Sequence, residues 1–173
     1  ASAKIHAAEE AGNLKAACEA AQAVCISVTR EKKTVAPPKL FDLTSLQREA
    51  NRIYGYTAKQ TLDLAQTLYE KKLLTYPRTD SNYLTDDMGE TAKSIVTLLC
   101  GKLPFMEGSD FTPDVSRLLD SKKVSDHHAI IPTLVAGETD IGTLPIGERE
   151  IIKLIAKQVL RAVSESYRFR ETV

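Results

Sequence analysis

"FDLTSLQREANRIYGYTAKQTLDLAQTLYEKK", residues 41–72, predicts two helices joined by a short turn. Apolar side chains recur with the spacing of one helical face, at Leu46, Ala50 and Ile53 and then at Leu62, Ala65 and Leu68 or Tyr69. Helix pairs with so short a turn occur in helix-turn-helix DNA-binding proteins and in plain helical bundles. The pattern alone favours the bundle and leaves a non-catalytic DNA-binding module as the alternative.

The ends of these two helices carry their own signals. Two pairs of residues have the spacing of capping boxes: Thr44 with Gln47, and Thr57 with Gln60. Gly55 stands where the first helix should end, because glycine tolerates the left-handed backbone of a helix terminus. The second helix is expected to run to about Lys72, before "LLTYP" becomes extended.

The rest of the chain predicts more helix than strand. Helices are expected at residues 7–22, 85–102 (capped by Thr85), 115–119 and 148–163, strands at 23–30 and 167–173, and a loop at 103–114. In the last helix, Ile152, Ile155, Val159 and Ala162 share one face, and Lys153, Lys157 and Arg161 the other. The fold class is therefore mainly α, and α+β overall, with the C-terminal strand expected to pair with the strand near Val24.

A boundary is expected at Pro37-Pro38, a stiff extended connector. It divides the chain into residues 1–36, with a helix and a strand, a helical domain at 37–165, and a return strand at 166–173. The helical domain contains the helix-turn-helix-like pair.

Composition leaves the partner open. Lys plus Arg and Asp plus Glu both number 23, so no global positive field indicates a nucleic acid. The three cysteines form neither a zinc pattern nor an even disulfide set, which is typical of a reducing compartment. No stretch approaches the roughly 18 to 20 apolar residues of a membrane span. We expect an intracellular protein, and the start without methionine indicates a fragment of a longer chain.

"TYPRTDS", residues 75–81, is a candidate catalytic segment. Pro77 restricts the residue before it to extended conformations, and in an extended chain Tyr76 and Arg78 project to the same side. A phenol is a poor nucleophile at neutral pH unless a cation stabilises its anion, and Arg78 offers donors that match phosphate oxygens. The pair suits attack on a phosphodiester, although most tyrosines simply pack.

"SDHHAIIPT", residues 125–133, is the second candidate. A histidine can donate a hydrogen bond to a phosphate or pass a proton to a leaving oxygen. Zinc binding is disfavoured, because two successive residues rarely point at one ion and no further Cys or His lies nearby in the sequence.

Together, "LFDLTSLQREANRIYGYTAKQTLDLAQTLYEKKLLTYPRTDSNYL" and "DHHAIIPT" resemble the type IA DNA topoisomerases, and "YPR" with the doubled histidine is similar to their bacterial topoisomerase III branch. The resemblance implies an enzyme that cleaves and rejoins single-stranded DNA through a 5′-phosphotyrosine and changes DNA topology without ATP. It implies Tyr76 as the nucleophile, Arg78 as the phosphate-binding cation, and His127 rather than His128 as the catalytic histidine. Supporting or DNA-binding roles are implied for Asp80, Glu70, Gln66, Lys59 and Thr75.

The resemblance also implies what lies elsewhere. Residues 37–165 would be the tyrosine-bearing gate domain, and residues 1–36 and 166–173 part of the hinge domain. The Mg²⁺-binding domain and the main strand-binding domain of the family match nothing in this sequence. We therefore expect no metal site or cofactor in this chain, Mg²⁺ in the full-length enzyme, no membrane partner, and a fragment that is inactive alone. Its place would be the bacterial cytoplasm, associated with DNA.

Overall fold

Two units make up the chain, and the computed structural model describes residues 4–102 and 111–173 of them. One unit is Ala1–Lys33 with Arg168–Val173, and the other is Thr34–Tyr167. The loop expected at 103–114 lies largely outside the described residues.

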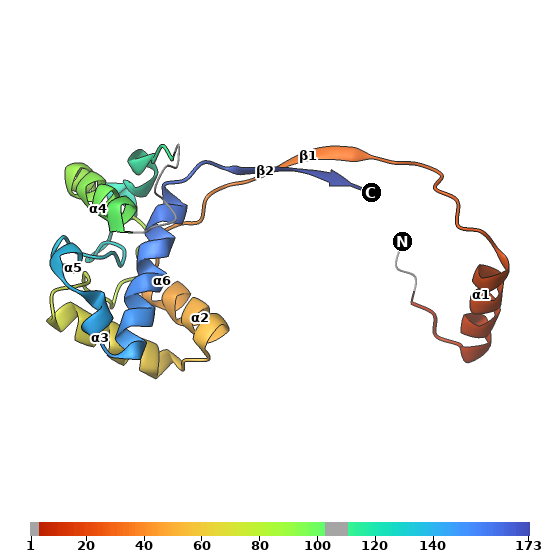
Figure 1. Cartoon of the computed structure of the whole chain (residues 1–173), viewed down its shortest axis with the longest axis horizontal. Helices are drawn as coiled ribbons and strands as arrows, with labels where there is room; N and C mark the ends of the chain where they lie inside the picture. Colours follow the sequence, from red (N-terminus) through yellow and green to blue (C-terminus); the bar gives the residue numbers. More distant parts are fainter. Residues whose placement is uncertain (1–3, 103–110) are drawn as a thin grey trace. The chain divides into compact units, whose positions relative to one another are not determined.

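The smaller unit contains α1 (Ala8–Ala20), as predicted, and most of a two-stranded sheet of β1 (Arg30–Val35) and β2 (Tyr167–Thr172) (Figure 1). The prediction of a strand at 23–30 is wrong, because Val24 and Ile26 lie exposed in irregular chain. The pairing register of the C-terminal strand explains why no strand forms at 23–28. Thr29 exchanges two backbone hydrogen bonds with Val173, at 2.8 and 3.0 Å, so no described strand of this chain lies opposite residues 23–28.

Helices dominate the larger unit. It contains α2 (Leu43–Tyr54), α3 (Ala58–Glu70), α4 (Gly89–Lys102), α5 (Val135–Glu138) and α6 (Ile146–Ala162). Single turns of 3₁₀-helix lie between them: η1 (Asp86–Met88), η3 (Val115–Leu118), η4 (Ser121–Lys123) and η5 (Ile141–Thr143). The mainly α, α+β fold class is confirmed. No helix among the described residues is long and apolar enough to cross a membrane.

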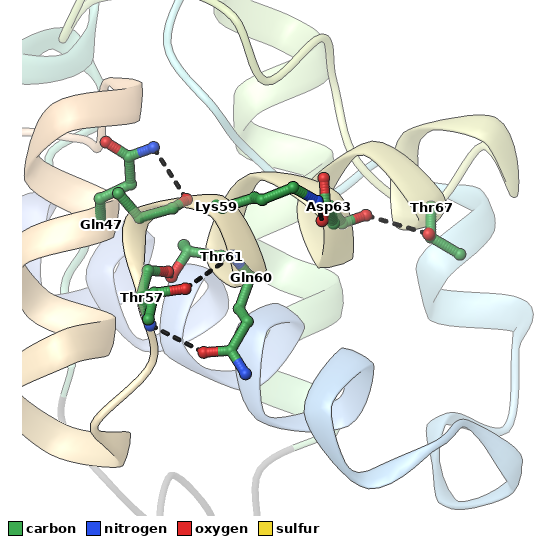
Figure 2. A network of polar contacts seen from close by, with 8 residues as sticks. Gln47, Thr57, Lys59, Gln60, Thr61, Asp63 and Thr67 are labelled. Atoms are coloured by element: carbon green, nitrogen blue, oxygen red, sulfur yellow. Dashed lines mark hydrogen bonds and ion pairs between the residues drawn. The ribbon is translucent and has the colours of Figure 1, made fainter.

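The start of α2 differs from its prediction. Asp42 caps the helix: its carboxylate accepts from the backbone N–H of Ser45 at 2.6 Å, and the Ser45 hydroxyl accepts from the Asp42 N–H at 3.1 Å. The capping box proposed for Thr44 and Gln47 is therefore wrong. Gln47 instead donates to the Ala58 carbonyl at 3.1 Å and ties α2 to the next helix (Figure 2).

Of three other predicted helix ends, two are confirmed and one is wrong. Gly55 ends α2 with a φ of 73°, and Thr57 and Gln60 form the predicted capping box at the start of α3 (Figure 2). Thr85 precedes η1 without capping it through its side chain, and α4 begins only at Gly89, so the Thr85 cap is wrong. The chain forms a 3₁₀ turn first because the Met88 N–H bonds to the Thr85 carbonyl, at 3.0 Å.

The core of the larger unit is built around α6, which packs against α2, α3 and α4 (Figure 1). The predicted apolar face of α6 is buried, and its predicted basic face is exposed. Leu68 of α3 and Ile155 of α6 are both fully buried in one cluster. Burial of each such side chain contributes about 1.5 to 3 kcal/mol, so this cluster fixes the base of α3 and the segment that follows it.

Candidate active site

Two segments far apart in the sequence lie side by side directly after α3. The Thr75 N–H donates to the Ile131 carbonyl and the Thr133 N–H donates to the Leu73 carbonyl, both at 3.0 Å. Leu74 and Pro132 form an antiparallel bridge between these bonds. The "TYPR" segment and the "HHAIIP" segment therefore form one short antiparallel ribbon, and both candidate motifs belong to the same site.

Thr75 strengthens this ribbon with its side chain. Its hydroxyl donates to the Ala129 carbonyl at 3.1 Å and accepts from the Ile131 N–H at 3.0 Å. Ala129 and Ile131 are themselves buried, so these groups would otherwise lose their water contacts without compensation. The residue directly before Tyr76 is thereby fixed to the histidine segment.

Tyr76 lies in a row of three rings. Its ring centroid is 4.5 Å from that of His127, at an interplanar angle of 51°, and 5.3 Å from that of Tyr69, in an edge-to-face arrangement. Tyr76 is half-buried, whereas His127 and Tyr69 are exposed. The sequence pattern places Tyr69 only in an apolar stripe of α3, but the residue is exposed and contacts the Tyr76 ring, so it faces the site instead of the core.

The two adjacent histidines have different surroundings. His127 is exposed and contacts the Tyr76 ring. His128 is half-buried, and its Nδ1 lies 2.9 Å from the Ala129 carbonyl. A carbonyl oxygen can only accept, so this contact occupies the Nδ1 of His128 as a donor to its own backbone segment.

Arg78 and Asp80 follow Pro77 in the chain, and both side chains are exposed. The Asp80 carboxylate accepts from the Ser125 hydroxyl at 3.0 Å, which joins it to the chain two residues before His127. Neither the Arg78 guanidinium nor the Tyr76 hydroxyl has a hydrogen-bond or ion-pair partner among the described residues. Both groups are free to engage a ligand.

Gln66 and Glu70 lie on the last two turns of α3, and the Gln66 amide donates to the Glu70 carboxylate at 3.1 Å. The Gln66 side-chain oxygen is buried and accepts no hydrogen bond within the described residues. These residues sit on the helix that carries Tyr69, so they belong to the same end of α3 as the ring row.

Lys59 lies apart from this cluster. It is in the first turn of α3, about three turns of helix away from Glu70. Its ammonium is 2.7 Å from the Asp63 carboxylate, which raises the pKa of Lys59, and its side chain is 85% exposed (Figure 2). The structure therefore does not bring Lys59 together with Tyr76.

The chemistry of the donor set does not fit a magnesium site. Within residues 4–102 and 111–173, no three His, Cys, Asp or Glu side chains come together as metal ligands.

Two bacterial DNA topoisomerases match most of the chain. The chain is 37% identical over 171 residues to the DNA topoisomerase 3 of Bacillus licheniformis, a match that covers 92% of this chain and 22% of that protein. It is 40% identical over 153 residues to the DNA topoisomerase 3 of Staphylococcus saprophyticus, covering 86% of this chain and 21% of the relative. The chain thus spans about a fifth of the length of these relatives.

A solved structure and a family model both match DNA topoisomerases. The full-length topoisomerase I from Thermotoga maritima superposes with a TM-score of 0.69 at 27% identity, over 98% of this chain and 27% of that one. The family model described as DNA topoisomerase matches residues 1–173. The chain belongs to the type IA DNA topoisomerase family.

Proposed function

We propose that this chain carries the nucleophile-bearing part of a type IA topoisomerase active site, with Tyr76 as the nucleophile toward single-stranded DNA. One observation supports it above the others. Tyr76 and His127, from segments about fifty residues apart, bring their rings to a centroid distance of 4.5 Å, and Arg78, two residues after Tyr76, has no partner among the described residues. Packing alone does not require an exposed histidine against a half-buried tyrosine.

In the proposed step, the Tyr76 oxygen attacks the phosphorus of a DNA phosphodiester. The new bond joins the tyrosine to the 5′ phosphate, the bond from phosphorus to the 3′ oxygen breaks, and that oxygen leaves as a hydroxyl. The phenol proton is lost and the 3′ oxygen gains a proton, so charge and atoms balance. Rejoining is the same step in reverse, which explains why no ATP is needed.

Arg78 is the proposed phosphate ligand, because a planar guanidinium can bind two phosphate oxygens at once and stabilise the charge that develops on them. His127 is the proposed hydrogen-bond or proton donor, because its ring contacts that of Tyr76, whereas the Nδ1 of His128 is bound to the Ala129 carbonyl. Asp80, Gln66, Glu70 and Thr75 are proposed as supporting groups.

We assign residues 37–165 to the gate domain, and residues 1–36 and 166–173 to part of the hinge domain. Mg²⁺ and most strand contacts would come from other parts of a longer enzyme, so the isolated chain is expected not to cleave DNA. Lys59 fits a DNA contact away from the reacting phosphate, because it is exposed at the far end of α3.

The test is a chimera in which this chain replaces the matching segment of the Bacillus licheniformis DNA topoisomerase 3. The chimera should form a covalent adduct with a labelled single-stranded oligonucleotide, and Tyr76→Phe should abolish it. Tyr83→Phe is the matched control, because the Tyr83 ring contacts the Lys39 and Lys123 ammonium groups, at 5.2 and 4.6 Å, and does not belong to the row of Tyr69, Tyr76 and His127. An adduct that survives Tyr76→Phe would contradict the assignment and leave a non-catalytic binding module.

A further inference from the structure

Thr79 joins three segments of the larger unit at one buried point. Its side chain is buried, and its hydroxyl donates to the His127 carbonyl at 2.7 Å. The same hydroxyl accepts from the Ser81 N–H at 3.1 Å. Its own carbonyl accepts from the Leu43 N–H, at 3.0 Å, where α2 begins. Thr79 is thus bound to its own turn, to the histidine segment and to a helix start.

The His127 side chain has little else to hold it. It is exposed, so burial does not fix it, and neither ring nitrogen has a hydrogen-bond partner among the described residues. On one side of it, the Ser125 side chain is hydrogen-bonded to the Asp80 carboxylate; on the other side, the Ala129 N–H donates to the Tyr83 carbonyl at 2.9 Å. Between these two points, the carbonyl of His127 itself is held by Thr79.

We propose that Thr79 is a positioning residue that holds the His127 ring against Tyr76. The proposal rests on the proposed function for its catalytic meaning, but the contact it describes exists in this chain alone. Thr75 and Thr79 flank Tyr76 and Arg78, and their hydroxyls bind the histidine segment at Ala129 and at His127. These two hydroxyls make the nucleophile turn and the histidine move as one body. Loss of the Thr79 hydroxyl releases the histidine end of that body.

The first experiment uses the chain as it is. Nuclear Overhauser contacts between the Tyr76 and His127 rings are measured in the unaltered chain, in Thr79→Val, which keeps the shape but removes the hydroxyl, and in Thr79→Ser, which keeps the hydroxyl. The ring contacts should be lost in Thr79→Val and retained in Thr79→Ser. A folded Thr79→Val chain with the contacts intact overturns the proposal.

Thr133→Val is the matched control. The Thr133 hydroxyl donates to the Lys72 carbonyl at 2.6 Å, so it also links the two segments but at the end away from His127. This variant should lower stability comparably and leave the Tyr76–His127 contacts unchanged. Loss of the contacts in both valine variants would mean that any weakening of the ribbon frees the histidine, and would also overturn a specific role for Thr79.

If Thr79→Val does not fold, a second measurement tests the hydrogen bond from the Thr79 hydroxyl to the His127 carbonyl directly. In the unaltered chain, the Thr79 hydroxyl proton should exchange slowly enough to be observed and show scalar coupling across the hydrogen bond to the His127 carbonyl carbon. A hydroxyl proton that exchanges as fast as that of an exposed threonine overturns the proposal.

The catalytic consequence is tested in the chimera described above. Thr79→Val should slow adduct formation by about tenfold to 100-fold, because a small misplacement of a reacting group costs rate on this scale. Oligonucleotide affinity should be unchanged, and Thr79→Ser should restore the rate. An unaltered chimera without an adduct would refute the proposed function alone, whereas a Thr79→Val chimera with full rate would refute the positioning role alone.

Discussion

Lys72 connects α3 to the nucleophile segment in a backbone conformation that disfavours lysine. Its φ is 61°, and it is the one described residue other than glycine with a positive φ. The Lys72 N–H donates to the Tyr69 carbonyl at 2.8 Å, and the Leu73 N–H donates to the Leu68 carbonyl at 2.9 Å. These two bonds form a Schellman motif, in which the left-handed position is usually glycine.

Lys72→Gly should therefore stabilise the chain relative to Lys72→Ala. Both variants remove the lysine side chain, whose contacts then cancel in the comparison. In the folded state, the left-handed conformation costs alanine about 1 to 2 kcal/mol, and glycine avoids this cost. Glycine in turn gives the unfolded chain more conformational freedom than alanine, which lowers the stability of the glycine variant by about 0.4 to 1 kcal/mol. The net difference is about 0.5 to 1 kcal/mol in favour of glycine. A chain of this length converts 1 kcal/mol into about 2 to 4 °C of Tm.

Urea titrations followed by circular dichroism would measure the two free energies of unfolding, and thermal melts would give the Tm values. The Thr133 hydroxyl bonds to the Lys72 carbonyl and not to its side chain, so this bond should survive in both variants. Equal stability of the two variants, or a more stable alanine variant, would refute the reading of this turn as strained.

Three further variants test a buried leucine, a hydrogen-bonded tyrosine and the exposed histidine of the site. Leu68→Ala should lower the free energy of unfolding by about 2 to 5 kcal/mol, measured in urea, because Leu68 is fully buried in the core beneath α3. The hydrogen bond from the Tyr56 hydroxyl to the Glu150 carboxylate, and then burial, raise the pKa of Tyr56 to about 12. Because this pKa lies above the ordinary value of about 10, the contribution of Tyr56 to the free energy of unfolding is complete below pH 10 and is lost as the pH rises toward 12. Urea titrations between pH 10 and pH 12 should therefore show a smaller loss of stability in Tyr56→Phe than in the unaltered chain. In the chimera, His127→Ala should slow adduct formation by about 100-fold with little change in oligonucleotide affinity, and unchanged cleavage kinetics would count against a chemical role for this histidine.

Sequence periodicity predicted the helices that bury a face. In α6, Ile155 and Val159 are buried in the core while Lys153 and Lys157 are exposed to solvent. The 3.6-residue spacing of apolar side chains was therefore enough to predict this helix and its buried face. Helix starts are harder, because several residues near a start can serve as caps. Asp42 caps α2 in place of Thr44, and the Leu43 N–H is also paired with Thr79, far along the sequence. Local spacing carries no information about that partner.

Strand position and site geometry depend even more on distant partners. The alternation at Val24 predicted a strand that does not form, because Thr29 already lies opposite Val173. Tyr76, Arg78 and His127 could be selected from their motifs, since reactive residue types stand out in a sequence. Tyr69 and Thr79 could not be selected, because their contacts with Tyr76 and His127 arise only when separate segments pack together.

The identity of the nucleophile can be read from a single peptide. Trypsin cleaves after Lys72 and is expected to release residues 73–78, "LLTYPR", which contain Tyr76 as their one tyrosine. After the chimera has reacted with a single-stranded oligonucleotide and nuclease has trimmed the DNA, mass spectrometry should find the 5′-linked nucleotide on this peptide. A nucleotide attached to any other peptide, or an unmodified "LLTYPR" in protein that has cleaved DNA, would contradict the assignment of Tyr76.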